Sequence, residues 1–149
     1  MNESIRPDQS MLDTPSGFTF GTRSARGFHD TVEIVRSALA EHGFGIVSEI
    51  DLKKTFHTKL DKEIRHHLVL GACSAPFAYA VTQAVPSVAA LIPCNVVVRE
   101  LEDDTCAIEA FDPGVMASLA GEENLTAELR ELAGSVRSDL MKAVASISA

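Results

Sequence analysis

Cys73 and Cys94, two of the three cysteines in this 149-residue chain, flank an apolar segment that contains three prolines. A pair of thiols can bind a soft metal ion, form a reversible disulfide or carry a sulfur species. Asn95 directly follows the second cysteine, and a helix is predicted to begin just after Cys73. Asn95 and the free backbone amides of that helix could lower a thiol pKa or hold an anion. These residues define the first candidate site.

Packing alone offers a second explanation for the same cysteines. Cysteine is among the most buried residue types and behaves as a small hydrophobic side chain. The small-residue run at 71–75, GACSA, fits a close approach of two backbones. Cys106 has no companion motif in its predicted hairpin, so we expect it to be a packed side chain. For Cys73 and Cys94 both interpretations stay open, and a catalytic thiol would have to be partly exposed.

Acidic and basic side chains supply further candidates. Glu49 and Asp51 lie two residues apart on one predicted strand, and Glu109 is expected on another strand of the sheet. Paired carboxylates can perform acid–base chemistry when one raises the pKa of the other. A solvated strand face with Asp51 as a helix cap is the favoured interpretation. Lys59 and nearby lysines could line an anion pocket with the cysteine edge, although such runs usually form a solvated helix face. Glu49 and Lys59 join the cysteine pair as candidate ligand-binding residues.

The histidines do not complete a metal site. His66 and His67 point to opposite faces of their predicted strand, so they cannot chelate one ion together. His67 and Cys73 share a face, yet six residues of strand separate them by about 20 Å. The chain also lacks zinc-ligand spacing, a glycine-rich phosphate loop and a nucleophile elbow. We predict no metal-ligand set and no cofactor.

Hydrophobic periodicity predicts a single folded domain at 16–149, after a polar segment at 1–15 that we expect to be a disordered tail. Phe28, Val32, Val35 and Leu39, for example, recur at helical spacing. Strands are predicted at 16–23, 44–51, 66–72, 95–100 and 105–110, and helices at 28–42, 52–60, 75–85, from 112–113 and from about 124 onward.

This order predicts a two-layer α+β fold of the type β-α-β4-α, with helices inserted between strands and a long C-terminal helix. The two main helices cannot cover both faces of the sheet. One face therefore stays open, which invites a ligand or a second copy of the chain.

The net charge of −8 argues against nucleic acid and anionic membranes as partners, because both are bound through clustered Lys and Arg. The chain has no tryptophan and one tyrosine, so it offers few platforms for stacking bases. Its start lacks a basic region followed by an apolar run, and no apolar run is long enough to span a bilayer. Three cysteines without close spacing do not form a secreted disulfide framework. We expect a cytoplasmic protein.

Four stretches of the chain form a recognisable set: GFGIVSEIDLKKTFHTKL at 43–60, LVLGAC at 68–73, PSVAALIPCNVVV at 86–98 and AFDPGVM at 110–116. Together they resemble the DUF302 family, a domain family of unknown function. The two cysteine motifs are the most specific part, and the resemblance extends over roughly 44–147. His66 and His67 depart from the family pattern, which more often has Tyr, Lys or Arg there.

The resemblance implies a β-α-β4-α core related to the TATA-binding-protein fold, usually as a homodimer, with no DNA binding and no established activity. It favours antiparallel strands on either side of the proline-containing segment, which would bring Cys73 and Cys94 to one edge of the sheet. We therefore predict a homodimeric binding module with a small-molecule, sulfur-species or soft-metal site near these cysteines. A thiol-dependent redox enzyme and a structural dimer with packed cysteines are the alternatives.

Overall fold

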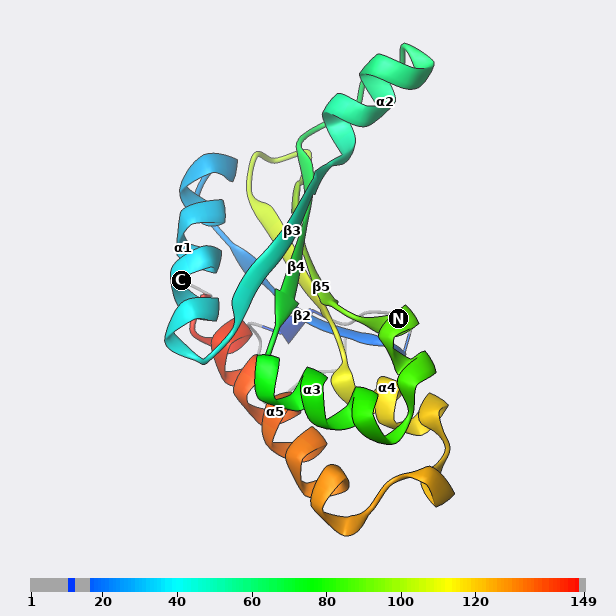
Figure 1. Cartoon of the computed structure of the whole chain (residues 1–149). Helices are drawn as coiled ribbons and strands as arrows, with labels where there is room; N and C mark the ends of the chain where they lie inside the picture. The colour runs from blue at the N-terminus through cyan, green and yellow to red at the C-terminus, as the bar shows by residue number, and fades with distance from the viewer. Residues whose placement is uncertain (1–10, 13–16, 148–149) are drawn as a thin grey trace.

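The chain is built around one antiparallel sheet, shown in Figure 1 as a computed structural model that describes residues 11–12 and 17–147. The strand order is β1-β2-β6-β5-β4-β3, and each neighbouring pair is antiparallel. The strands are β1 (Met11–Leu12), β2 (Thr19–Ser24), β3 (Gly45–Asp51), β4 (His67–Cys73), β5 (Cys94–Glu100) and β6 (Cys106–Phe111).

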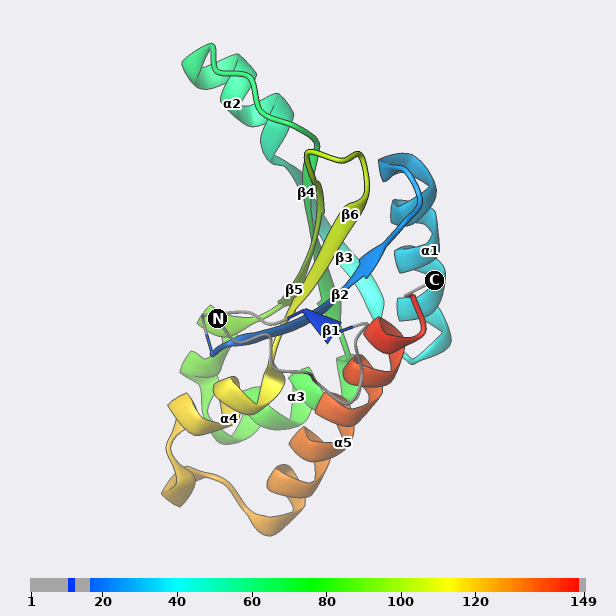
Figure 2. The same cartoon turned by 180° about the vertical axis from the view of Figure 1, so that it is seen from behind.

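Two helices, α1 (Phe28–Glu41) and α5 (Ala127–Ala145), cover one face of the sheet (Figures 1 and 2). The core lies between these two layers. Leu39 of α1, Leu70 of β4 and Leu140 of α5 are each at most 1% exposed, and full burial of one such side chain contributes about 1.5–3 kcal/mol. The predicted two-layer α+β fold with a long C-terminal helix is confirmed.

Local sequence signals set the ends of these elements. Gly43 follows α1 with φ 89°, and its N–H donates to the Ala40 carbonyl at 3.2 Å, which ends the helix. Asp51 accepts a hydrogen bond from the Lys54 N–H at 3.0 Å and so caps α2 (Leu52–Leu60), as predicted.

The inserted helices lie at the two ends of the sheet. α3 (Ala75–Ala84) and the 3₁₀ helix η1 (Pro86–Leu91) connect β4 to β5, whereas α4 (Pro113–Ala120) and η2 (Glu122–Asn124) lead from β6 to α5. In Figures 1 and 2, α3 and α4 lie at one end of the sheet and α2 projects from the other. No helix among the described residues is both long enough and apolar enough to cross a bilayer.

Part of the predicted tail is ordered. Met11 and Leu12 pair with Thr22 and Gly21 as the edge strand β1, so the prediction of disorder is wrong for these two residues. Two residues give too short a pattern to be recognised as a strand in sequence. The rest of the predicted tail, 1–10 and 13–15, lies outside the described residues.

Two element details also differ from the prediction. α5 begins at Ala127, later than the expected 124, because the Thr126 hydroxyl accepts from the Leu129 N–H at 3.1 Å and caps the helix there. The strand predicted at 44–51 is not regular, because its register against β4 shifts between Ile46 and Ser48.

Candidate functional site

β5 runs through the middle of the sheet and presents different side chains to its two faces. Val96 and Val98 are fully buried on the face that α1 and α5 cover. Because successive side chains of a strand alternate between faces, Asn95, Val97 and Arg99 lie on the other face. This face, which α1 and α5 do not cover, is called the open face below.

The open face carries a pocket of about 620 Å³. Glu109 and Phe111 of β6 line it because Ile108 and Ala110, which alternate with them, are buried on the helix-covered face. The segment at 90–93, which comprises the end of η1 and the link to β5, supplies a further wall. Small-molecule sites typically have volumes of roughly 300–1,000 Å³, so this pocket, called the open-face pocket, can enclose a ligand.

Close packing against β4 holds this wall in place. A Cβ atom added to Gly71 would lie 2.6 Å from Cγ of Pro93 and would also collide with Oγ of Ser48. Gly71 pairs in register with Asn95, so this contact lies directly beside the pocket. Any larger residue at Gly71 would push the wall away from the sheet, which gives the glycine of the LGAC motif a structural role.

A single ion pair occupies the floor of the pocket. Nε of Arg99 donates to Oε1 of Glu109 at 2.9 Å, and Nη2 donates to Oε2 at 3.2 Å. Glu109 pairs in register with Val97, so Arg99 reaches diagonally across the strands to meet it. The hydrogen bond to Glu109 raises the pKa of the Arg99 guanidinium, although burial acts in the opposite direction. Arg99 therefore stays a cation held in a fixed orientation.

His67 lies opposite Arg99 in the β4–β5 register and also lines the pocket. Burial lowers the pKa of His67 below its usual value of 6.5, and the Arg99 cation lowers it further, while Glu109 acts against both. At neutral pH the imidazole is therefore uncharged, with one nitrogen able to donate a hydrogen bond and the other able to accept one.

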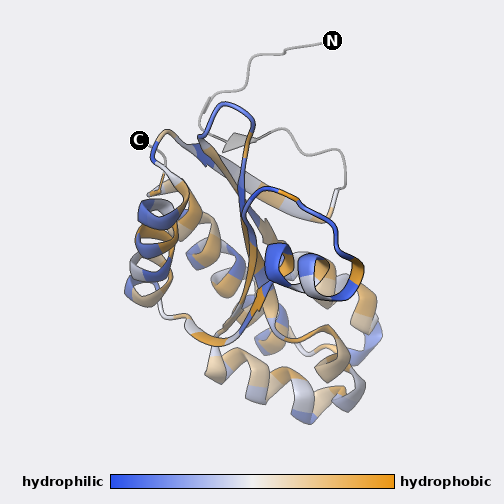
Figure 3. Ribbon diagram, turned by 90° about the horizontal axis from the view of Figure 1, so that it is seen from above, coloured by the Kyte–Doolittle hydropathy of each residue, from blue (hydrophilic) through white to orange (hydrophobic). Residues whose placement is uncertain are grey.

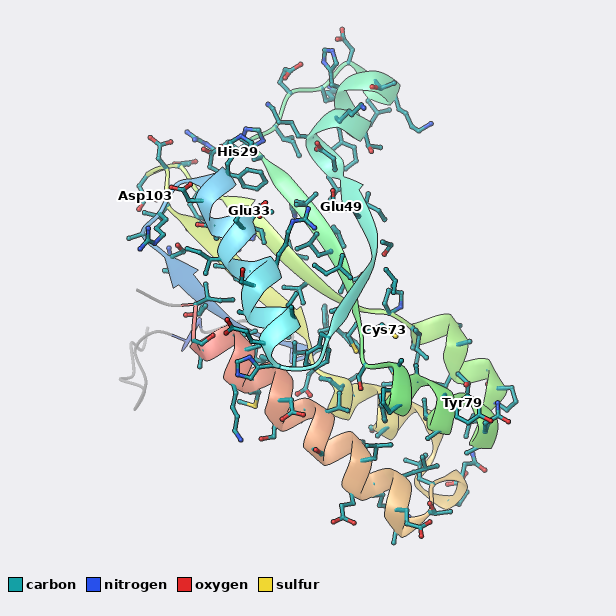
Figure 4. The ribbon with its side chains drawn as sticks, turned by 60° about the vertical axis from the view of Figure 1, so that its left-hand side comes forward. His29, Glu33, Glu49, Cys73, Tyr79 and Asp103 are labelled. Atoms are coloured by element: carbon teal, nitrogen blue, oxygen red, sulfur yellow. The ribbon has the colours of Figure 1, made fainter. Side chains whose placement is uncertain are left out.

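The two cysteines lie at the same end of neighbouring strands. Cys94 pairs with Ala72, so Cys73 is the next residue along β4. Figure 4 shows Cys73 at the junction of β4 and α3. The space that both cysteines line measures only about 10 Å³, which is about one water molecule and too small for an organic ligand. The antiparallel arrangement thus places the two cysteines at neighbouring positions of adjacent strands, but in a packed region.

Burial keeps the Cys94 thiol protonated. Cys94 is 7% exposed, and its pKa rises to about 11 mainly through burial, with smaller effects of Cys73 and Asp112. A thiol nucleophile needs the opposite shift. Cys73 is half-buried and Cys106 is buried, and neither forms a disulfide. A reactive role for Cys73 or Cys94 stays a prediction.

The other predicted site residues are divided between separate places. Asn95 lines the open-face pocket. Glu49 forms an ion pair with Arg36 of α1 and lies beside that helix in Figure 4. Lys59 belongs to α2, which follows the Asp51 end of β3, whereas Cys73 pairs with Gly45 at the opposite end. Lys59 and the cysteines therefore lie beyond opposite ends of β3, and the structure does not bring them together.

Sequence reasoning missed Arg99, and it considered Glu109 only for acid–base chemistry and His67 only as a metal ligand. The alternation of Asn95, Val97 and Arg99 along one face of β5 was available as a signal, but the partner of Arg99 depends on the register of the hairpin. Among the described residues, no three His, Cys, Asp or Glu side chains are grouped to hold a metal ion.

The fold and the pocket define a class of protein: a two-layer α+β domain with a ligand-sized pocket on the open face of its sheet. The model of the family described as "Domain of unknown function DUF302" matches residues 20–147. The chain belongs to this family.

One solved structure supports the fold independently. The chain is similar to the crystal structure of an uncharacterized conserved DUF302 protein from Bacillus stearothermophilus, with a TM-score of 0.73 and 20% sequence identity. The match covers 85% of this chain and 95% of that one. No match was found among curated proteins.

Proposed function

We propose that this protein is a homodimeric module that binds a small molecule in the open-face pocket. The pocket carries the proposal because it combines a volume of about 620 Å³ with apolar walls and a few polar side chains on its floor. Binding sites for small molecules have this composition, in which the walls supply affinity and the polar groups fix orientation. The cysteine edge offers no comparable space.

An uncharged fluorescent probe tests this proposal. N-phenyl-1-naphthylamine emits strongly only in an apolar environment, and we expect a saturable increase at one probe per chain. Val97 lines the middle of the pocket, so Val97→Lys fills it and places an ammonium group among its walls. We expect this variant to bind the probe at least about tenfold more weakly, because the longer side chain occupies the space of the probe and its charge makes the pocket polar.

Val47→Lys is the matched control, because Val47 is 63% exposed on β3 and lies outside the pocket. It should bind the probe as the unmodified protein does. Equal binding by both lysine variants, with both shown to be folded by circular dichroism, would refute the pocket as the site.

The homodimer rests on α2, the helix that projects from the sheet (Figures 1 and 2). No residue of α2 is buried, and Leu60 is 62% exposed. Residues 52–65 carry five basic and two acidic side chains, a net charge of +3, whereas the whole chain carries −8 and the remainder therefore −11. In Figure 3 this segment is largely hydrophilic, with single hydrophobic positions. A basic projection with an apolar tip is complementary to the acidic body of a second copy.

The edge strand β3 is a weaker candidate for the same contact. The register shift between Ile46 and Ser48 interrupts its ladder, and Glu49 and Asp51 add negative charge. Irregularities and charges of this kind hinder the pairing of two sheet edges.

Light scattering at micromolar concentration tests the dimer. We expect twice the chain mass for the unmodified protein, and a shift toward the monomer for Leu60→Asp, because a carboxylate is then buried in the contact. Leu119→Asp is the matched control, since Leu119 is 66% exposed on α4. A monomer in the unmodified protein, or equal masses for the two variants, contradicts the proposal.

The cytoplasmic location belongs to the same proposal. Cys73, Cys94 and Cys106 are free thiols, and unpaired cysteines are typical of a reducing compartment.

A further inference from the structure

We propose that the open-face pocket binds the carboxylate of a small, otherwise apolar acid on the unused edge of the Arg99 guanidinium. This inference rests on the proposed function and specifies the class of its ligand. Its basis is the hydrogen-bonding capacity that remains on the pocket floor.

Arg99 uses only part of its donor capacity. A guanidinium carries five N–H groups, and Glu109 accepts one from Nε and one from Nη2. No other described residue accepts from Arg99, which leaves both N–H groups of Nη1 and one of Nη2 available. One N–H of Nη1 and the remaining N–H of Nη2 form the second edge of the planar fork, which matches the two oxygens of a carboxylate.

Glu109 makes this edge a fixed feature. The two hydrogen bonds to Glu109 lock the plane of the guanidinium before any ligand arrives, and the Glu109 side chain is only 23% exposed. Arg99 itself is 39% exposed and lines the pocket, so a ligand can reach it. A donor that is already oriented loses little entropy on binding.

Neighbouring groups add donors without adding charge. His67 is directly opposite Arg99 and uncharged at neutral pH, so it can donate one hydrogen bond to a ligand oxygen. The Asn95 amide lines the same pocket and can donate another. Of the two charges that act on the pKa of His67, the Arg99 cation has a larger effect than the Glu109 carboxylate. An oxygen acceptor between His67 and Arg99 is thus favoured.

The charge balance selects an anion with a single charge. Arg99 is the one cation lining this pocket among the described residues, and Glu109 already neutralises much of it. A phosphate dianion would place two further negative charges beside Glu109 without a second cation. The walls from Leu91, Ile92 and Phe111 favour an apolar body. A carboxylate attached to a hydrocarbon or aromatic body fits these conditions.

A pair of isosteric probes tests the inference: 4-phenylbutyrate and its uncharged amide, 4-phenylbutyramide. Each is titrated against protein carrying N-phenyl-1-naphthylamine, and the displacement gives its Kd. We expect the carboxylate to bind at least about tenfold more tightly than the amide. Phenyl phosphate, as a dianion, should bind more weakly than the carboxylate.

The double variant Arg99→Gln/Glu109→Gln is the control. It replaces the ion pair by two amides that can still hydrogen-bond, so the floor stays filled and no charge is orphaned. In this variant we expect the Kd values of the carboxylate and the amide to differ by no more than about twofold. The Kd values of the amide and of the fluorescent probe should stay within about threefold of those for the unmodified protein.

The outcomes separate this inference from the proposed function. Suppose that the fluorescent probe binds. If the amide then displaces it as well as the carboxylate does, or if neither compound displaces it, the carboxylate site is refuted but the pocket remains the proposed binding site. The carboxylate site is also refuted if the preference persists in the double variant. If the fluorescent probe itself does not bind, the proposed function fails.

Discussion

Gly21→Ala is expected to destabilise the protein by about 2–3 kcal/mol, because an added Cβ has no room between β2 and β6. The new atom would collide with the Ile108 carbonyl oxygen and would lie 3.3 Å from both Cα and Cγ of Glu109. The first neighbour is backbone, which cannot rotate away, so the two strands must separate locally. The free energy of unfolding from urea titrations measures this loss.

Gly45→Ala is the matched control, since Gly45 also lies in a strand but would meet nothing within 4 Å. We expect its effect to stay within about 0.5 kcal/mol. Because Gly21 pairs in register with Glu109, Gly21→Ala should also disturb the Arg99–Glu109 pair and weaken the carboxylate preference. Equal free energies of unfolding for the two variants would contradict the close packing of β2 against β6 at Gly21.

Native Cys94 is expected to react with iodoacetamide at least about 100-fold more slowly at pH 7 than Cys94 in the unfolded chain. A pKa of about 11 in place of 9.0 reduces the thiolate fraction from about 1 in 100 to about 1 in 10,000. Burial of the sulfur slows the reaction further. Mass spectrometry of the labelled peptides, with and without urea, gives the two rates in one protein.

Cys73 serves as the internal reference, because it is half-buried and remains accessible in the native state. Its ratio of native to unfolded rates should lie closer to one than that of Cys94. A native rate for Cys94 within tenfold of its unfolded rate would contradict the packed interpretation and favour a thiol-dependent enzyme.

The fold could be predicted because its signals are local. Phe28, Val32, Val35 and Leu39 mark the buried stripe of α1, and Gly43 and Asp51 mark where helices end or begin. These features depend only on residues that are close in sequence, so they can be recognised without knowledge of the tertiary structure. The β1 strand failed this condition, because it exists only through its pairing with β2.

The site was only partly predictable because it depends on contacts between distant residues. The topology predicted that Cys73 and Cys94 lie at the same end of neighbouring strands. It did not predict the close packing around them. Arg99 and Glu109 meet through a diagonal contact that requires the register of two strands. Lys59 and the cysteines lie toward opposite ends of β3, a separation that depends on how β3 pairs with β4.

The central claim is that the open-face pocket is the ligand site, and amide chemical-shift mapping tests it most directly. The ¹⁵N-labelled protein is titrated with uncharged 4-phenylbutyramide, so that the test does not depend on the charge of the ligand. We expect the amide signals of Asn95, Val97, Arg99 and Glu109 to shift together and to saturate at one probe per chain. Saturable shifts confined to α2 or α5, with these four signals unmoved, would contradict the account.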